Sequence, residues 1–223
     1  MDCENIYVKK TFLNLPEDKQ QRILEEAVRE FAENGYQKAS LNTIVRRVGI
    51  AKGSMYQYFQ NKESLFFYVF ARFTGLVKLA VRESVATAGN GDFWGLVREV
   101  LWAGIRFLDS CPHYFQIYLK VLFESEVPRR EELVAQVRLF SMEFFGPLCV
   151  EAGEKDQLRR DVPPPMIIFM LDALLDRFLQ GYARPYLDGG LGLSGRSREQ
   201  LGSDVDLIIQ VLREGLCPGA EGE

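Results

Sequence analysis

Apolar residues recur along most of this 223-residue chain at the three- and four-residue spacing of an α-helix. In the first such stretch, Ile23, Ala27 and Phe31 stand four residues apart and form one apolar stripe. A proline precedes the stripe and Gly35 follows it, which suits the start and the end of a helix. The pattern therefore predicts a helix over about residues 16–34.

The same periodicity predicts further helices along the rest of the chain. A short helix begins after Ser40, a favourable N-cap, and Gly49 supplies a tight turn after it. Asn61 caps a longer helix that continues to about residue 85. The remaining predicted helices cover about residues 52–59, 92–109, 112–124, 128–152, 164–187 and 199–215. Alternation with a period of two is absent, so we predict an all-α fold of about nine helices.

Charge is shared unevenly between the two parts of the chain. Residues 38–62 carry five basic side chains and no acidic one, although the whole chain has a formal net charge of −4. Residues 1–62 hold ten basic and eight acidic residues, whereas residues 63–223 hold 17 and 23. A local basic surface on an acidic protein is the electrostatic pattern of a nucleic-acid-binding protein. The split predicts an N-terminal part that meets phosphate and a C-terminal part that does not.

Composition disfavours several other classes of protein. The four cysteines are far apart and the only histidine is His113, so we expect reduced thiols and no metal site. The first ten residues lack the apolar segment of a secretory signal, and no unbroken apolar run approaches the ~18 residues that span a bilayer. We therefore expect a cytoplasmic protein that does not enter a membrane.

The sequence carries no constellation typical of an enzyme. No acid–base pair or activated nucleophile can be assembled from its residues, so we assign no catalytic residue and no cofactor. Residues 190–195 spell the GxGxxG pattern of a dinucleotide-binding turn, but that turn needs a strand before it and a helix directly after it. No βαβ unit is predicted, so we expect a flexible loop at these glycines.

The acid-free segment of residues 38–62 fits the physical demands of a helix-turn-helix. Such a unit places its second helix in the major groove of DNA, so this helix needs an apolar underside and a polar outer face. Met55 and Phe59 stand four residues apart and are expected to pack inward. The side chains expected to point elsewhere are those of Lys52, Ser54, Tyr56 and Tyr58. A structural helical hairpin with a solvated basic face would show a similar pattern, so both interpretations stay open on these features.

Residues 31–66 resemble the N-terminal part of the TetR family of bacterial transcriptional regulators. The segment reads FAENGYQKASLNTIVRRVGIAKGSMYQYFQNKESLF. Its pieces are individually unspecific, and together they form a strong signature: Gly35-Tyr36, a hydroxyl residue before the second helix, Val48-Gly49-Ile50, Lys52-Gly53, Tyr56-x-Tyr58-Phe59 and Lys62-Glu63. The resemblance extends over about residues 16–66, and the remainder matches only in length and helical character. Ala51 departs from the serine or threonine common in the family, which loses an N-cap of ~1 kcal/mol.

This resemblance implies two domains. Residues 1–62 would form a three-helix DNA-binding domain with the helix-turn-helix, and residues 63–223 a larger helical domain for effector binding and dimerisation. The residues implied to contact DNA are Ser40, Thr43, Arg46, Lys52, Gly53, Ser54, Tyr56, Tyr58 and Lys62. Of these, Lys52, Gly53 and Ser54 would face the groove, and most of the others would hold phosphate groups.

A pocket for a small hydrophobic effector is also implied, among the predicted helices between residues 92 and 187. The candidate lining residues are Trp102, Phe115, Tyr118, Phe144 and Phe169. All are large apolar side chains, for which packing in the core is the alternative role. Asp172 and Asp176 interrupt an otherwise apolar helix, where unpaired buried carboxylates would be costly. Three arrangements would avoid this cost. The two aspartates pair with an arginine, which could come from a second subunit; they face solvent; or they meet a cationic effector.

Taken together, the family's properties imply a homodimeric repressor. It would bind a pseudo-palindromic operator in double-stranded DNA, and a small hydrophobic effector would release it. The broad apolar faces of the helices at about residues 164–187 and 199–215 would form the dimer interface. The alternative from a different class is a helical-bundle protein that binds a protein partner without recognising an operator.

Overall fold

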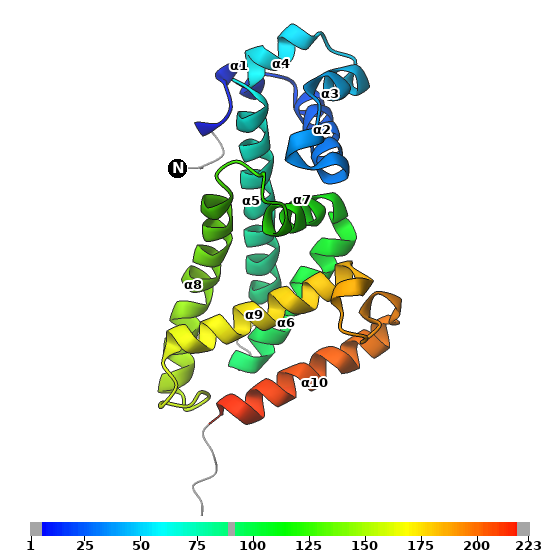
Figure 1. Ribbon diagram of the computed structural model, residues 1–223. Helices are drawn as coiled ribbons and strands as arrows, with labels where there is room; N and C mark the ends of the chain where they lie inside the picture. Colours follow the sequence, from blue (N-terminus) through cyan, green and yellow to red (C-terminus); the bar gives the residue numbers. More distant parts are fainter. Residues whose placement is uncertain (1–5, 89–91, 218–223) are drawn as a thin grey trace, which may run out of the picture. The chain divides into compact units, whose positions relative to one another are not determined.

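The structure of the protein is a computed structural model that describes residues 6–88 and 92–217 (Figure 1). Every regular element in these two ranges is a helix and none is a strand, which confirms the predicted all-α fold. The elements in chain order are α1 (Lys10–Leu13), α2 (Glu17–Lys38), α3 (Leu41–Val48), α4 (Lys52–Tyr58), α5 (Lys62–Ala88), α6 (Phe93–Ser110), α7 (Pro112–Phe123), α8 (Arg130–Glu154), α9 (Pro164–Ala183), the short 3₁₀ helices η2 (Pro185–Leu187) and η3 (Leu193–Gly195), and α10 (Arg198–Leu216).

The predicted helices agree with the observed ones to within a few residues, with two differences. α1 was not predicted, because four residues are too few to show a helical period. α2 continues to Lys38, but Gly35 inside it has φ 67°, which lies outside the helical region. The predicted stop at Gly35 is therefore a kink, after which the chain makes one further turn.

The chain packs as two compact units. The first comprises Met1–Leu76 and Cys111–Ala135, and the second comprises Val77–Ser110 and Gln136–Glu223. α5 and α8 each begin in the first unit and end in the second. These units follow from packing alone. The predicted boundary between a DNA-binding domain (residues 1–62) and an effector-binding domain (residues 63–223) is a functional division, and it stays a prediction.

Aromatic rings fill the core of the first unit. Phe12, Phe31 and Phe59 are each at most 1% exposed. Phe31 meets Phe66 of α5 edge-on, with ring centroids 5.0 Å apart, and Phe12 lies 5.0 Å from Phe59. Such ring pairs contribute about 0.5–1.5 kcal/mol beyond the burial of their area. The rings therefore join α1, α2 and α5 to the residue that follows α4.

The core of the second unit lies where α6 packs against both α9 and α10 (Figure 1). Where α6 meets α9, a Cβ atom at Gly104 would lie 2.7 Å from Leu179 Cδ1, so a larger residue would force Leu179 to shift. α10 begins with a capping box: Ser197 Oγ accepts from the Gln200 backbone N–H, and Gln200 Oε1 accepts from the Ser197 N–H. The second unit is thus stabilised by the close contact between α6 and α9 and by the capping box at the start of α10.

The two aspartates on α9 have a partner within their own chain. Arg138 of α8 donates from Nη1 to Asp172 Oδ2 and from Nη2 to Asp176 Oδ2, both at 2.6 Å. Ser141 Oγ donates to Asp172 Oδ1, also at 2.6 Å. Pairing with arginine, the first of the predicted alternatives, is therefore confirmed, and the pairing is intramolecular.

Two helices are long and apolar enough to cross a membrane by length and composition. They are Lys62–Thr87, with 44% of its apolar window buried, and Arg130–Glu154, with 17%. The expectation that no segment is long enough considered only unbroken apolar runs, whereas these windows allow up to two charged residues. Core helices of soluble proteins meet the same criteria, so the two helices are weak evidence of a membrane span.

A buried carboxylate ties α2 to α3. Glu30 is 2% exposed, and its Oε1 accepts from the Ser40 backbone N–H at 2.9 Å. Its Oε2 lies 3.4 Å from Arg47 Nη1. A carboxylate this deeply buried is tolerated only when it is paired and hydrogen-bonded. Glu30 thereby fixes both the start of α3, at Ser40, and the guanidinium near its end.

We predict that Glu30→Ala lowers the free energy of unfolding by about 1–3 kcal/mol, because Arg47 and the Ser40 N–H lose their buried partner. Urea denaturation would measure the change. Glu33→Ala is the matched control, since Glu33 also meets Arg47, at 3.4 Å, but its side chain is 47% exposed. The control should change stability by less than about 0.5 kcal/mol. Equal losses in both variants would contradict the role given to Glu30.

Candidate nucleic-acid interface

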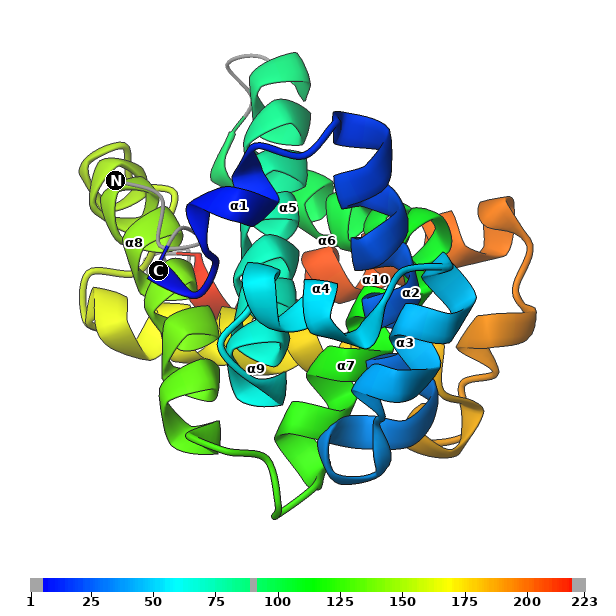
Figure 2. The same cartoon turned by 90° about the horizontal axis from the view of Figure 1, so that it is seen from above.

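α3 and α4 are joined by a tight turn centred on Gly49 (Figure 2). Gly49 has φ 76° and ψ 34°, the left-handed conformation in which glycine carries no steric cost. The backbone N–H groups of Gly49 and Ile50 both donate to Val45 O at 3.0 Å. Arg22 of α2 donates from Nη2 to Val48 O at 3.1 Å. The predicted turn is confirmed, and the carbonyls at the end of α3 are satisfied from two directions.

α4 has one buried face and one exposed face, as a recognition helix requires. Met55 on α4 and Phe59, directly after it, are each 1% exposed, so their predicted inward packing is confirmed. Lys52 and Gly53 are exposed, Tyr56 is 44% exposed, and Ser54 is partly exposed. The outer face therefore presents small, basic and hydroxyl groups.

Tyr58 does not lie on that outer face. It is 6% exposed, and its ring centroid is 5.9 Å from that of Phe12. The expectation that it points away from the core is wrong, because residues three apart share a helix face and Tyr58 follows Met55 by three. Its contact with phosphate stays a prediction, with the burial of the ring counting against it.

The predicted contacts around α3 are more accessible. Arg46 is exposed, and Ser40 and Thr43 are partly exposed. Ser40 occupies the N-cap position of α3, but its side chain makes no capping hydrogen bond within the described residues. The role expected for it as a side-chain cap is therefore wrong, since Glu30 accepts from its backbone N–H instead.

Two of the five basic residues in the acid-free segment are engaged inside the protein. Arg47 lies within 4 Å of three carboxylates of α2, those of Glu26, Glu30 and Glu33. Lys62 Nζ donates to the backbone carbonyls of three residues that lead into α3: Tyr36 at 2.8 Å, Gln37 at 3.1 Å and Ala39 at 3.3 Å. Lys38, Arg46 and Lys52 are exposed, and Arg47 is exposed too despite its ion pairs.

Lys62 is held in a cage rather than presented to solvent. An ammonium group has three protons, and three carbonyls accept them. Its Nζ also lies 4.5 Å from the centroid of the Tyr36 ring, within cation–π range. Desolvation by burial lowers the pKa of Lys62 and raises that of Tyr36. The predicted phosphate contact of Lys62 stays a prediction, and this geometry favours a structural role.

The start of α4 lacks a side-chain cap, as the departure at Ala51 predicts. Ala51 is the N-cap residue and has no polar side-chain atom to offer. Asn61 does cap α5, since its Oδ1 accepts from the Ser64 backbone N–H at 2.8 Å. α4 is therefore less well capped at its N-terminus than α5.

The five candidate effector residues do not form one group in the described part of the chain. Trp102 and Phe144 are partly buried and pack against the core of the second unit. Phe115 and Tyr118 are 5% and 3% exposed and belong to the first unit. Phe169, also in the second unit, is 69% exposed.

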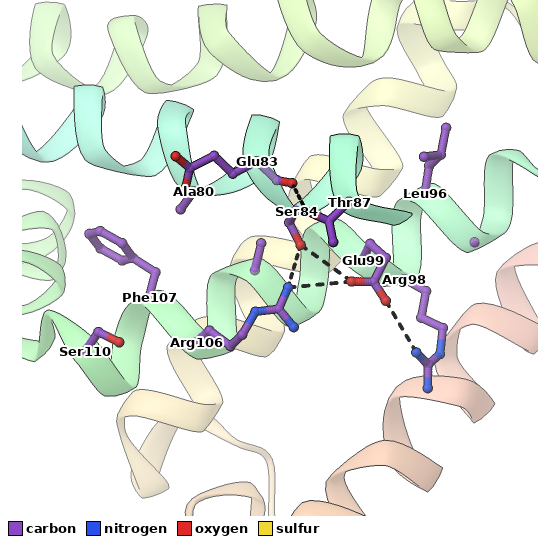
Figure 3. Close-up of a pocket in the computed structure, with 12 residues that line it drawn as sticks. Ala80, Glu83, Ser84, Thr87, Leu96, Arg98, Glu99, Arg106, Phe107 and Ser110 are labelled. Carbon is purple, nitrogen blue, oxygen red and sulfur yellow. Dashed lines mark hydrogen bonds and ion pairs between the residues drawn. The ribbon is translucent and has the colours of Figure 1, made fainter. Parts of the chain in front are cut away.

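A groove of about 890 Å³ lies between α5 and α6 in the second unit (Figure 3). Figure 3 shows Ser84, Arg98 and Arg106 converging on the Glu99 carboxylate, with Arg106 Nη2 3.5 Å from Glu99 Oε2. Arg98 Nε also donates to Asp206 Oδ1 at 2.6 Å. The groove is lined by Ala80, Glu83, Ser84, Thr87, Gly95, Leu96, Arg98, Glu99, Ala103, Arg106, Phe107 and Ser110. The five candidate effector residues are not among these.

Within residues 6–88 and 92–217, no group of three or more metal-ligating side chains is found.

Comparison with known proteins agrees with the helix-turn-helix geometry. The model of the family described as "Bacterial regulatory proteins, tetR family" matches residues 23–69. The HTH-type transcriptional repressor Rv1474c of Mycobacterium tuberculosis is 24% identical over 196 residues, which cover 87% of this chain and 93% of that protein. The crystal structure of a TetR family transcriptional regulator from Chloroflexus aurantiacus has a TM-score of 0.73 and 27% identity, and covers 95% of this chain and 99% of its own.

This chain belongs to the TetR family. It is therefore a DNA-binding transcriptional regulator, and TetR-family regulators are transcription factors rather than enzymes. The structure of FadR from Bacillus subtilis in complex with stearoyl-CoA shares the fold, with a TM-score of 0.68, 15% identity, and coverage of 87% of this chain and 98% of that one. At that identity the likeness concerns the fold alone.

The segment around α1 lies outside the family match and was not predicted. Lys9 and Thr11 donate to carbonyls of α4, and Phe12 is completely buried. No sequence signal pointed to these residues, because the segment is too short for periodicity and precedes the recognisable motif. Arg47 was likewise counted as a free charge, since its three carboxylate partners precede it by 14 to 21 positions.

We predict that Lys62→Ala acts mainly on stability in this TetR-family protein. Loss of the three carbonyl contacts should lower the free energy of unfolding by about 1–3 kcal/mol, measured by urea denaturation. Arg46→Ala is the comparison, because Arg46 is exposed. It should leave stability within about 0.5 kcal/mol. It should also weaken binding to duplex DNA, with the slope of log affinity against log salt reduced by ~1. If Lys62→Ala kept wild-type stability and instead reduced the slope of log affinity against log salt by ~1, Lys62 would be a phosphate contact after all.

Proposed function

We propose that this protein is a homodimeric repressor that binds a pseudo-palindromic operator through two helix-turn-helix units and is released by a small apolar effector. The observation that carries the proposal is the two-sided α4. Its underside is anchored by Met55, while Lys52, Gly53 and Tyr56 remain exposed. Side chains of these types bind phosphate oxygens and base edges. The full-length relative Rv1474c is itself a repressor, which supports this direction of control.

At the operator, α4 lies in the major groove and α3 crosses the backbone. Lys52 and Ser54 reach base edges, and the Gly53 backbone approaches the groove closely. Arg46 and Tyr56 hold phosphates on either side. Ser40 and Thr43 add partly exposed hydroxyls that donate to phosphate. Tyr58 and Lys62 contribute less to DNA binding than the sequence implied. The Tyr58 ring packs on Phe12, and Lys62 donates to backbone carbonyls of the first unit.

Dimerisation through α9 and α10 is supported by their exposed apolar side chains. Phe169 on α9 is 69% exposed, and Met166, three positions earlier on the same face, is 51% exposed. On α10, Leu207 and Val211 are four apart and 59% and 60% exposed. Large apolar side chains exposed on one face of a helix favour a protein partner over solvent. A two-fold pair of subunits doubles the DNA contact at half-sites one or more helical turns apart.

The effector acts in the C-terminal part of the chain. The groove between α5 and α6 is one candidate place, and α5 itself runs without a break from Lys62 to Ala88. Binding along α5 can therefore bias a helix whose first residue meets the carbonyls leading into α3. Trp102 and Phe144 stay candidates for effector contact. The burial of Phe115 and Tyr118 and the exposure of Phe169 count against those three. Coupling between effector and operator is typically worth about 1–3 kcal/mol.

The stearoyl-CoA bound by the FadR fold neighbour supports an effector with a long apolar part. Arg98, Glu99 and Arg106 make part of the groove wall charged, and that part does not favour a long apolar chain. TetR-family regulators are soluble cytoplasmic proteins, and we infer the same location for this one. α5, with 44% of its apolar window buried, then serves as a core helix rather than a membrane span.

Binding to duplex DNA at rising salt separates this proposal from a helical bundle that binds a protein partner. A repressor binds an operator selected from random duplexes, and it loses affinity steeply as salt rises because phosphate contacts release counterions. Absence of salt-dependent duplex binding, measured by mobility shift, would favour the protein-binding alternative.

We predict that Gly53→Ala weakens operator binding without destabilising the protein. A Cβ atom at Gly53 would meet no atom within 4 Å, so nothing in the folded chain requires glycine there. Replacing a helical glycine with alanine should even raise stability, by up to about 1 kcal/mol. Gly146→Ala in α8 is the matched control, because a Cβ there also meets nothing within 4 Å. Fluorescence anisotropy should show lower affinity for Gly53→Ala only; equal affinity in both variants would contradict close approach at Gly53.

We predict that Phe169→Glu yields a monomer, because a carboxylate would be buried unpaired in the dimer interface. Sedimentation velocity would report the loss of the dimer, and operator affinity should fall with it. Leu79→Glu on α5, where Leu79 is 53% exposed, introduces the same charge outside the proposed interface and should leave the dimer intact. A dimeric Phe169 variant would argue against an interface at α9.

A further inference from the structure

The C-terminal end of the recognition helix receives hydrogen bonds from the segment around α1. The Lys9 backbone N–H donates to Tyr58 O at 2.9 Å, and Lys9 Nζ donates to Tyr56 O at 2.7 Å. Thr11 Oγ1 donates to Gln57 O. Three consecutive carbonyls, the last three of α4, thus have donors from one short stretch of chain.

These contacts matter because α4 is poorly equipped to hold itself. It has seven residues, well below the ~12–15 at which an isolated helix becomes marginally stable in water. Its N-terminus has no side-chain cap, since Ala51 stands there. The last carbonyls of any helix lack intrahelical partners. A lysine at this end also complements the negative pole of the helix dipole.

Phe12 fixes the segment in place. Its side chain is 0% exposed, and its ring centroid lies 5.0 Å from that of Phe59, 5.9 Å from Tyr58 and 5.7 Å from Tyr68. α1 is therefore anchored both to the residues that end α4 and to α5. The donors of Lys9 and Thr11 are held at a set position relative to the recognition helix.

We propose that Lys9 and Thr11 are positioning residues for operator recognition: they cap α4 from outside the helix-turn-helix and hold its axis in the orientation that enters the major groove. The proposal rests on the proposed function, because it presumes that α4 reads the operator. Both residues lie before residues 23–69, the range of the family match, so the cap extends the DNA-binding machinery of this chain beyond that motif.

The exposed Lys9 could in principle serve DNA through its charge instead, and Thr11 separates the two roles. Thr11→Val keeps the shape and the net charge and removes only the hydroxyl donor to Gln57 O. Thr11→Ser keeps the donor. Lys9→Met removes the Nζ donor and the charge together. A phosphate contact would appear in the salt dependence of binding, whereas the loss of a cap would not.

The test measures operator and random-duplex affinity at several salt concentrations for the full chain and these three variants. We expect Thr11→Val to lose roughly two- to tenfold in operator affinity, the worth of one hydrogen bond, with unchanged random-duplex affinity and salt slope. Thr11→Ser should recover the loss, and Lys9→Met should lose operator affinity at an unchanged slope. Hydrogen exchange of the α4 amides should accelerate in Thr11→Val, and the free energy of unfolding should fall by no more than the worth of this one exposed hydrogen bond.

Three results would overturn the proposal. Wild-type operator affinity in Thr11→Val would show that the cap does not position α4. A slope reduced by ~1 in Lys9→Met would show that Lys9 acts as a phosphate ligand. A lower urea midpoint in Thr11→Val with unchanged operator affinity would show a merely structural contact. A wild-type protein that binds no duplex would instead refute the proposed function, so the two failures are distinguishable.

Discussion

α4 has only seven residues and cannot stabilise itself, so much of the first unit holds it in place. Its underside is anchored by Met55, Tyr58 and Phe59, all nearly inaccessible to solvent. The glycine turn fixes where it starts, and the α1 segment satisfies the carbonyls where it ends. Support from three sides leaves only the outer face free for DNA. A Cβ atom at Gly53 on that face would meet no atom within 4 Å, so packing within the chain does not require glycine there.

The surface charge available for DNA is smaller than the sequence suggests. Arg47 is used to neutralise the acidic face of α2, and Lys62 is used to gather the carbonyls that lead into α3. Both contacts tie the helix-turn-helix to other residues of the chain. Basic groups that face carboxylates or carbonyls position α3 and α4, whereas Lys38, Arg46 and Lys52 are exposed to solvent.

The sequence predicted the helices, the Gly49 turn and the inward packing of Met55, because all three depend on local periodicity and backbone conformation. It failed where the outcome depended on residues distant in the chain. Tyr58 was misplaced in part by overlooking that it shares a helix face with Met55, and its ring partner Phe12 comes from a segment too short to show a pattern. The groove between α5 and α6 was missed because its charged residues resemble a solvated helix face. The effector pocket could not be placed from composition, since core and pocket use the same aromatic residues.

We propose that the exposed face of α4, held at its C-terminal end by the α1 segment, reads the operator. A crystal structure of the protein bound to a selected operator duplex would examine it. We predict α4 in the major groove with the Gly53 backbone against the bases, Lys52 and Ser54 at base edges, and Lys9 and Thr11 still bonded to the α4 carbonyls. A complex in which α4 lies outside the groove, or in which Lys62 leaves its carbonyl cage for a phosphate, would contradict it.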